Sequence, residues 1–144
     1  QGSSNCTALS NEPDATAWIW EGTTVTPPVC ATGSTYAIRN EGQLSVSDAY
    51  VYVPYSGSGA YGIYSISGEI EVRGGMVEMS SGGTTTTAVA VLGGEATLGA
   101  TALHGGEGTV GTHALSVEGE FTEVTVVQSV LIAGTGSVGN GALL

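Results

Sequence analysis

A short pattern recurs along the chain at a nearly constant interval, and this interval restricts the possible folds more than any other feature. Each copy consists of glycine, then glutamate or glutamine, then an apolar and a polar residue. The copies begin at Gly42, Gly68, Gly94 and Gly119, which lie 26, 26 and 25 residues apart. A constant period of this length indicates stacked repeats, because each repeat needs its neighbours to bury its apolar face.

Three further sets of apolar or aromatic residues recur with nearly the same period, one of them four or five residues before the repeat glycines and the other two at fixed positions after them. The sets are Leu44, Ile70, Ala96 and Phe121; Ile38, Ile63, Val89 and Ala114; and Tyr50, Met76, Ala102 and Val127. Apolar and polar residues alternate around them, which indicates strands with one buried face. We therefore expect about three short strands in each repeat and an internal column formed by the first set.

Three strands and three turns in about 25 residues correspond to one coil of a right-handed parallel β-helix. Glycine pairs fall between the expected strands, where a corner requires positive φ. Coils stack about 4.8 Å apart. We expect an all-β protein, a short right-handed parallel β-helix (β-solenoid) of about four to five coils. An antiparallel sandwich is the alternative, but it gives no reason for a constant period.

The repeat divides the chain into three regions. We expect an N-terminal cap over residues 1–35, solenoid repeats over 36–133 and a glycine-rich C-terminal tail over 134–144. A cap covers the open edge of the first coil. Cys6 and Cys30 lie 24 residues apart, close to one coil, so we expect a disulfide that ties the cap down and contributes roughly 3 to 4 kcal/mol. Two free thiols are the alternative.

The composition indicates where the protein works and which partners are excluded. Lysine is absent, and two arginines face 13 acidic residues, which gives a net charge of -11. Nucleic acid and anionic lipid both require basic surfaces, and no apolar run reaches the ~18 residues of a membrane helix. Cysteine pairing and the start at Gln1 without methionine indicate a mature secreted protein, extracellular or at the cell surface, although an excised fragment would look the same.

Residues that carry chemistry are few and scattered. Asp14 and Asp48 are the two aspartates, and His104 and His113 lack the spaced partners of a metal site. We therefore expect no enzymatic activity, no cofactor and no metal. One row of glutamates follows the repeat glycines, namely Glu69, Glu95 and Glu120. A solvated acidic row is the preferred interpretation, and a weak calcium site is the alternative.

Three groups of residues are candidates for contact with other molecules. The first group is the tryptophan pair Trp18 and Trp20, for which burial in a core or interface is the alternative to stacking on a sugar. The second is the set of tyrosines Tyr50, Tyr52, Tyr55, Tyr61 and Tyr64. The third is the apolar part of the tail, Val138, Leu143 and Leu144, which we expect to lie along a second copy of the chain. A frayed terminus without a role, or the cut end of a longer chain, is the alternative.

Residues 61–77, with the sequence YGIYSISGEIEVRGGMV, resemble the repeats of bacterial surface and autotransporter-type adhesins that have pectate-lyase-like β-helices. The resemblance covers residues 36 to about 132 and implies an elongated extracellular β-solenoid without identifying a ligand. We expect a structural protein that assembles with itself into a surface filament or coat. The alternative is an adhesin or carbohydrate-binding module, including a phage-type surface or fibre protein, that recognises a glycan or a host surface.

Overall fold

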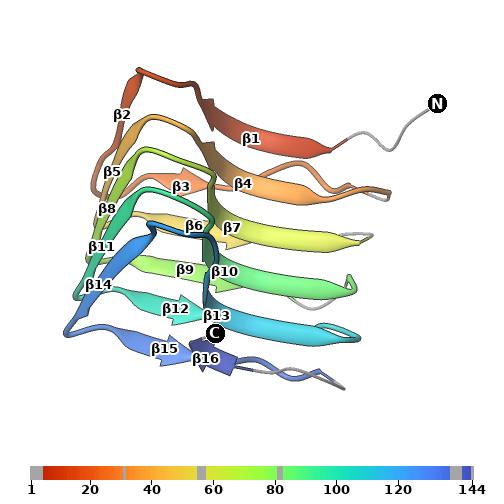
Figure 1. Ribbon diagram of the computed structural model, residues 1–144. Helices are drawn as coiled ribbons and strands as arrows, with labels where there is room; N and C mark the ends of the chain where they lie inside the picture. The colour runs from red at the N-terminus through yellow and green to blue at the C-terminus, as the bar shows by residue number, and fades with distance from the viewer. Residues whose placement is uncertain (1–4, 31, 55–57, 81–82, 137–140, 144) are drawn as a thin grey trace.

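The computed structural model describes residues 5–30, 32–54, 58–80, 83–136 and 141–143, the last three by their backbone alone. Within these residues the secondary structure consists of sixteen strands and their connecting turns, with no helix (Figure 1). Accordingly, the described part of the chain contains no helix long and apolar enough to cross a membrane.

The strands form three parallel sheets. In spatial order, sheet A contains β1 (Cys6–Asn11), β4 (Thr35–Asn40), β7 (Gly59–Ser65), β10 (Thr85–Val91), β13 (Gly111–Val117) and β16 (Gly141–Leu143). Sheet B contains β2 (Thr16–Ile19), β5 (Gln43–Ser47), β8 (Glu69–Arg73), β11 (Glu95–Gly99) and β14 (Glu123–Val127). Sheet C contains β3 (Thr24–Val25), β6 (Tyr50–Val53), β9 (Met76–Met79), β12 (Ala102–His104) and β15 (Val130–Ile132).

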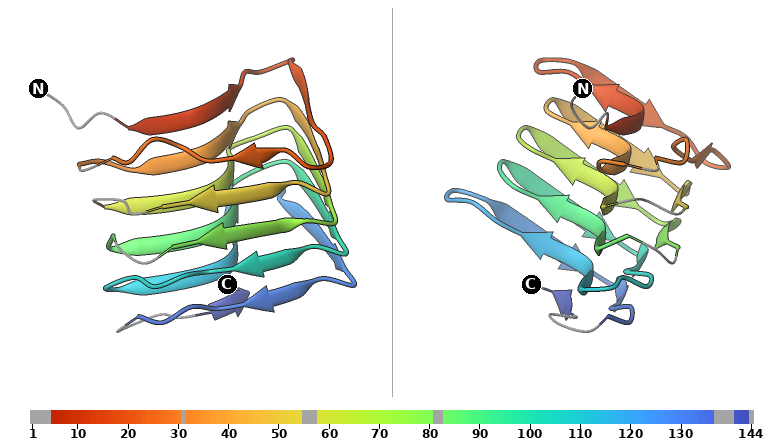
Figure 2. Two further views of the ribbon diagram at one scale, coloured as in Figure 1. Left: turned by 180° about the vertical axis from the view of Figure 1, so that it is seen from behind. Right: turned by 90° about the vertical axis from the view of Figure 1, so that its right-hand side faces the viewer.

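Three consecutive strands, one from each sheet, make one coil, and each coil lies directly below the preceding one (Figures 1 and 2). Coil 1 comprises β1 to β3 and coil 5 comprises β13 to β15, while β16 begins a further turn beside β13. This arrangement is a parallel β-solenoid of about five coils, which confirms the expected fold and excludes the antiparallel sandwich.

The core is built from columns of like side chains inside the coils. Leu44, Ile70 and Ala96 are aligned in sheet B, and Ile38, Ile63 and Val89 are aligned in sheet A; all are buried. Sheet C contributes Val51, Val77 and Leu103. Parallel pairing in constant register places equivalent residues above one another, so the period in the sequence becomes a continuous apolar interior.

The fourth copy of the pattern was aligned incorrectly from the sequence. The backbone N–H of Glu118, the residue that precedes Gly119, donates to a carbonyl oxygen of coil 4. In the same way the backbone N–H of Leu92, the residue that precedes Gly93, donates to a carbonyl oxygen of coil 3. Gly119 therefore corresponds to Gly93 and not to Gly94. Two additional residues follow Gly119 before β14 begins. The repeat glycines therefore mark a turn between sheets A and B, and this turn is two residues longer in coil 5 than in coil 4.

The longer turn shifts the expected residues that follow Gly119. Phe121 lies in the turn at φ 62° and is 97% exposed, and Val124 takes its expected place below Ala96. In the same way Val130 and Glu123 take the places expected for Val127 and Glu120. Ala114 precedes the turn, and Leu115 takes its place because Gly119 itself was aligned one residue out.

The N-terminal segment that we expected to form a cap continues all three sheets as coil 1. Its strands pair in parallel with β4, β5 and β6. At the other end of the chain, β16 places Leu143 beside Leu115, so this part of the expected tail has a partner within its own chain. Val138 and Leu144 lie outside the described residues.

Candidate functional site

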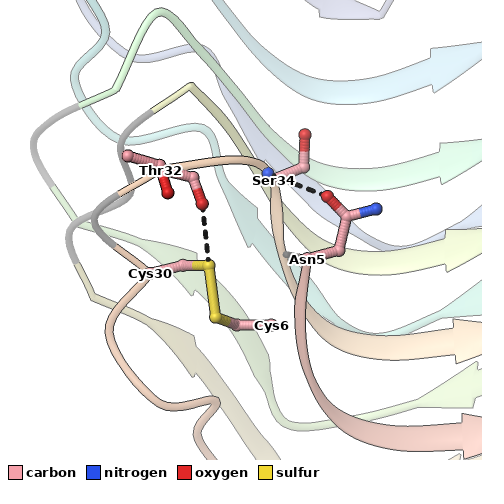
Figure 3. The surroundings of a disulfide bond; sticks show 5 residues. All are labelled: Asn5, Cys6, Cys30, Thr32 and Ser34. Atoms are coloured by element: carbon pink, nitrogen blue, oxygen red, sulfur yellow. Dashed lines mark hydrogen bonds between the residues drawn. A yellow bond between two sulfur atoms is a disulfide. The ribbon is translucent and has the colours of Figure 1, made fainter. Parts of the chain in front are cut away.

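The disulfide closes coil 1 near its two ends. Cys6 begins β1 and Cys30 follows β3, and their Cα atoms are 5.8 Å apart in the bonded pair. Figure 3 shows the Cys30 Sγ 3.2 Å from the carbonyl oxygen of Thr32, and the Ser34 N–H donating to Asn5 Oδ1 over 3.2 Å. The expected Cys6–Cys30 bridge is confirmed, and it holds the beginning of the first coil to the beginning of the second.

A ladder of buried polar side chains joins the first three coils. Asn11 Nδ2 donates to Asn40 Oδ1 over 2.8 Å, and Asn40 Nδ2 donates to Ser65 Oγ over 3.2 Å. Asn40 also donates to the Gly42 carbonyl oxygen over 3.0 Å. Buried amides with these partners fix the alignment of the coils, since a shifted alignment would leave polar atoms unpaired.

The two tryptophans lie at the exposed surface of coil 1. Trp18 is on the outward face of β2 and is 59% exposed, whereas its neighbours in the strand, Ala17 and Ile19, align with the inward-facing Leu44 and Val46. Trp20 follows the strand and is 67% exposed. Neither tryptophan is part of the core, so their burial in the chain's own core is ruled out.

The four described tyrosines of the predicted set lie on two different sheets. Tyr61 and Tyr64 lie on sheet A, where they pack with Tyr36, a residue that the sequence interpretation omitted. Tyr36 and Tyr61 stack with ring centroids 5.2 Å apart. Tyr50 and Tyr52 stack on sheet C, 5.9 Å apart, and Tyr55 lies outside the described residues.

The environments of Tyr50, Tyr61 and Tyr64 favour the protonated hydroxyl. The hydrogen bond between the Tyr50 hydroxyl and the Glu78 carboxylate raises the pKa of Tyr50 to about 12, with burial and the charge of Glu78 acting in the same direction. Burial is the largest cause that raises the pKa of Tyr61 and of Tyr64, and neighbouring tyrosines add to it. At neutral pH these hydroxyls are uncharged hydrogen-bond donors.

The acidic row is present on sheet B in a corrected form. Gln43, Glu69, Glu95 and Glu123 are aligned on successive strands, and Glu120 is in the turn before β14. Among the described residues, no group of three or more histidine, cysteine, aspartate or glutamate side chains is arranged to hold a metal ion. Asp14 and Asp48 lie at different corners of the coils, before β2 and β6, so the fold does not pair them.

Coil 5 differs from the coils above it in the side chains that it presents to solvent. Val127, Val130 and Ile132 are outward-facing and about half exposed. The positions beside them in coil 4 hold Gly99, Ala102 and His104. Strands β14 and β15 are the last members of sheets B and C, so each has one unpaired edge within the described chain.

Comparisons with known proteins identify no relative. No family model matches the chain, and neither the curated proteins nor the solved structures contain a match. The functional interpretation therefore depends on this molecule's own surfaces: an apolar terminal coil, a tryptophan-bearing face on sheet B and a tyrosine cluster on sheet A.

Proposed function

We propose that the protein is a non-enzymatic extracellular structural protein that associates with copies of itself end to end, as a subunit of a surface filament or coat. The observation that carries this proposal is the outward apolar surface of coil 5, formed by Val127 at the end of β14 and by Val130 and Ile132 of β15. The disulfide is compatible with an extracellular protein, since cytosolic conditions keep thiols reduced.

Strand β15, residues 130–132, reads VLI and is apolar on both faces. Parallel strands with such runs are typically covered on both faces, whereas strands with one solvated face alternate between apolar and polar residues. Strand β14 does alternate, but its last outward residue, Val127, continues the apolar surface of Val130 and Ile132. The same three outward positions in coil 3 hold Arg73, Met76 and Glu78. Strand β15 thus has the sequence of a covered strand and an exposed position in the chain.

The unpaired edges of β14 and β15 offer backbone hydrogen bonds as well as apolar surface. An exposed edge strand pairs readily with a strand of another chain. The opposite end of a second copy presents the edges of β2 and β3, which belong to the same two sheets. Placing that end below coil 5 continues sheets B and C in parallel. A head-to-tail contact of this kind propagates instead of closing, which produces a filament.

The negative net charge makes the association of copies depend on the salt concentration. Each chain carries a net charge of -11, so copies repel one another over distances that salt shortens to about 8 Å at physiological ionic strength. Glu123 is the one charged residue within β14 and β15. We expect association to strengthen as salt is added.

The test compares two substitutions in one column. Val130 and Met76 are both outward-facing residues of sheet C, 57% and 40% exposed, and each becomes glutamate in one variant. Val130→Glu places a charge in the proposed contact and should shift sedimentation to the monomer. Met76→Glu adds the same charge in coil 3 and should leave assembly close to that of the unmodified protein. Equal sedimentation of both variants and the unmodified protein contradicts the proposal.

Recognition of a glycan or host surface, as in an adhesin, is the second candidate function. The specific observation in its favour is the exposed tryptophan pair of coil 1, because large aromatic side chains in solvent are typical of contact sites. A binding role would show as saturable sugar binding by the monomer, and a purely structural role would not.

A further inference from the structure

A groove of about 190 Å³ lies on the outward face of sheet B, beside Trp18. It is lined by Thr16, Trp18, Gln43, Leu44, Ser45, Glu69 and Glu71. These residues come from β2, β5 and β8 of three successive coils, which lie side by side on the left of Figure 1.

The pairing of the strands gives the groove its walls and floor. Trp18, Ser45 and Glu71 are aligned on the three strands, as are Thr16, Gln43 and Glu69. The small Ser45 thus lies between a large aromatic side chain and a carboxylate. Two strand spacings separate the aromatic wall from the acidic wall, about 9.6 Å between backbones. The groove is therefore narrow, with one flat apolar wall and one wall of hydrogen-bond acceptors.

Strand pairing holds the backbone of the groove in place. Its residues lie on paired strands, and Leu44 beneath them is buried in the core column. Thr16 Oγ1 donates to Gln43 Oε1 over 3.4 Å at one end of the floor. A ligand therefore meets a preformed backbone and orders only side chains, among them the exposed Trp18.

We propose that this groove binds a sugar ring of a neutral or amino-substituted glycan. A pyranose has an apolar face of C–H groups, which packs against a flat aromatic ring, and a rim of hydroxyls. Gln43 and Ser45 offer neutral donors and acceptors to those hydroxyls, and Glu69 and Glu71 accept from hydroxyl or ammonium groups. The groove thus combines one aromatic platform with a few polar groups, as small-ligand sites do.

The charges of the groove select against acidic sugars. Glu69 and Glu71 belong to one wall, and the nearest cation on that strand, Arg73, donates from Nε to Glu71 Oε1 over 2.6 Å. A uronate carboxylate in the groove meets two carboxylates and one arginine that is already paired. An amino sugar meets favourable charges in the same place.

This site is tested separately from end-to-end association. Its side chains project from the outward face of sheet B, but Thr16 and Trp18 stand on β2, whose free edge is one side of the proposed contact. Binding is therefore measured in the Val130→Glu variant, in which the β2 edge should be free. The two proposals can fail separately.

The two tryptophans provide a reporter and its matched control. Trp20→Phe leaves Trp18 as the single tryptophan, and Trp18→Phe leaves Trp20, which is equally exposed but does not line the groove. The probes are tetramers of N-acetylglucosamine, glucosamine, glucose and galacturonate. The Trp20→Phe protein should show a saturable emission change with one or more of the first three. The Trp18→Phe protein should show none. No saturable change in the Trp20→Phe protein with any neutral or amino sugar, or an equal change from Trp20, overturns the proposal.

Calorimetry then tests the contribution of each wall. Trp18→Ala should weaken binding at least about tenfold, while Trp20→Ala should change it less than about twofold. Replacing Glu69 and Glu71 together by glutamine should abolish any preference for glucosamine and, by leaving Arg73 unpaired, allow the galacturonate tetramer to bind. Binding of galacturonate by the unmodified protein as tight as that of the neutral sugars contradicts the proposed selectivity.

Discussion

The two end coils of the solenoid are stabilised by different means. Coil 1 is tied to coil 2 by the Cys6–Cys30 disulfide and by the buried amide pair of Asn11 and Asn40, and it buries Ile19 despite its position at the end. Its turns carry charged side chains, namely Glu12, Asp14 and Glu21. These charges lie outside β2 and β3, the two edge strands that the proposed contact uses, and neither strand contains a charged residue.

Coil 5 has a different chemistry. Its last strand, β15, is apolar inside and outside, and Val127, Val130 and Ile132 present apolar surface to solvent. The difference indicates that the two ends of one repeat architecture solve the edge problem differently. The first end uses covalent and polar bonds within the chain, and the second leaves a surface that a second copy is suited to cover.

The largest effect is expected from aspartate in the sheet B column. Ile70→Asp places an unpaired carboxylate in the fully buried centre, which costs several kcal/mol against a total stability of about 5 to 15 kcal/mol, so no folded protein should form. Val124→Asp, in the same column but in coil 5, should cost only about 1 to 2 kcal/mol because Val124 is partly exposed. Urea denaturation followed by circular dichroism measures both. Equal damage from the two substitutions would show that coil 5 is packed like the centre.

Removal of the disulfide tests how coil 1 is held. The double variant Cys6→Ser, Cys30→Ser should lose about 3 to 4 kcal/mol of unfolding free energy, because the unfolded chain is no longer constrained by a loop of this length. Hydrogen exchange should accelerate in β1 to β3 and stay unchanged in β14 and β15. Acceleration spread evenly over all coils would contradict a local role at the N-terminal end.

An unsatisfied hydroxyl lies where coil 2 meets coil 1. Thr35 pairs with Cys6 across the two coils, and its Oγ1 is buried without a hydrogen-bond partner. Thr35→Val should therefore raise the unfolding free energy by about 1 kcal/mol. Thr86, in the same column, donates its hydroxyl to the Gly105 carbonyl oxygen, so Thr86→Val should lower stability by about as much. Thermal denaturation of both variants should give shifts of opposite sign.

The smallest effect belongs to sheet C, away from both ends. The pKa of Tyr50 is raised from 10 to about 12 because its protonated hydroxyl bonds to Glu78. This contribution is complete below pH 10 and is lost as the pH rises from about 10 to 12. Tyr50→Phe should remove that part of the pH dependence, about 0.5 kcal/mol or less at this exposed site. Absorbance titration at alkaline pH should show one fewer late-titrating tyrosine.

The sequence predicted the architecture well because a solenoid converts sequence period directly into spatial stacking. The expected column of Leu44, Ile70 and Ala96 is present, and the position of the disulfide followed from the length of one coil. The last member of the column was wrong, since a turn can gain residues without disturbing the strands on either side. Phe121 lies in such a turn at positive φ. Its apolar side chain matched the repeat pattern, so the sequence did not show that the residue belongs to a turn.

The surface sites were harder to predict, because they depend on which residues of different coils become neighbours. Tyr36 lies beside Tyr61 only once β4 and β7 are aligned, and the Trp18 groove needs Ser45 and Glu71 from two other coils. Asn11 and Asn40 carried no signal in the pattern, since a polar residue in an alternating strand is expected to face solvent. A correct alignment of the repeats would have brought each of these groups together.

The most direct measurement of the difference between the two ends is hydrogen exchange at increasing protein concentration. If coil 5 is covered by coil 1 of another copy, exchange should slow in β14, β15, β2 and β3 as the concentration and the salt are raised. Amides of β8 and β9, in the centre of the solenoid, should exchange at the same rate throughout. Exchange in β14 and β15 that is independent of concentration, under conditions where β8 and β9 are fully protected, would contradict association through the terminal coils.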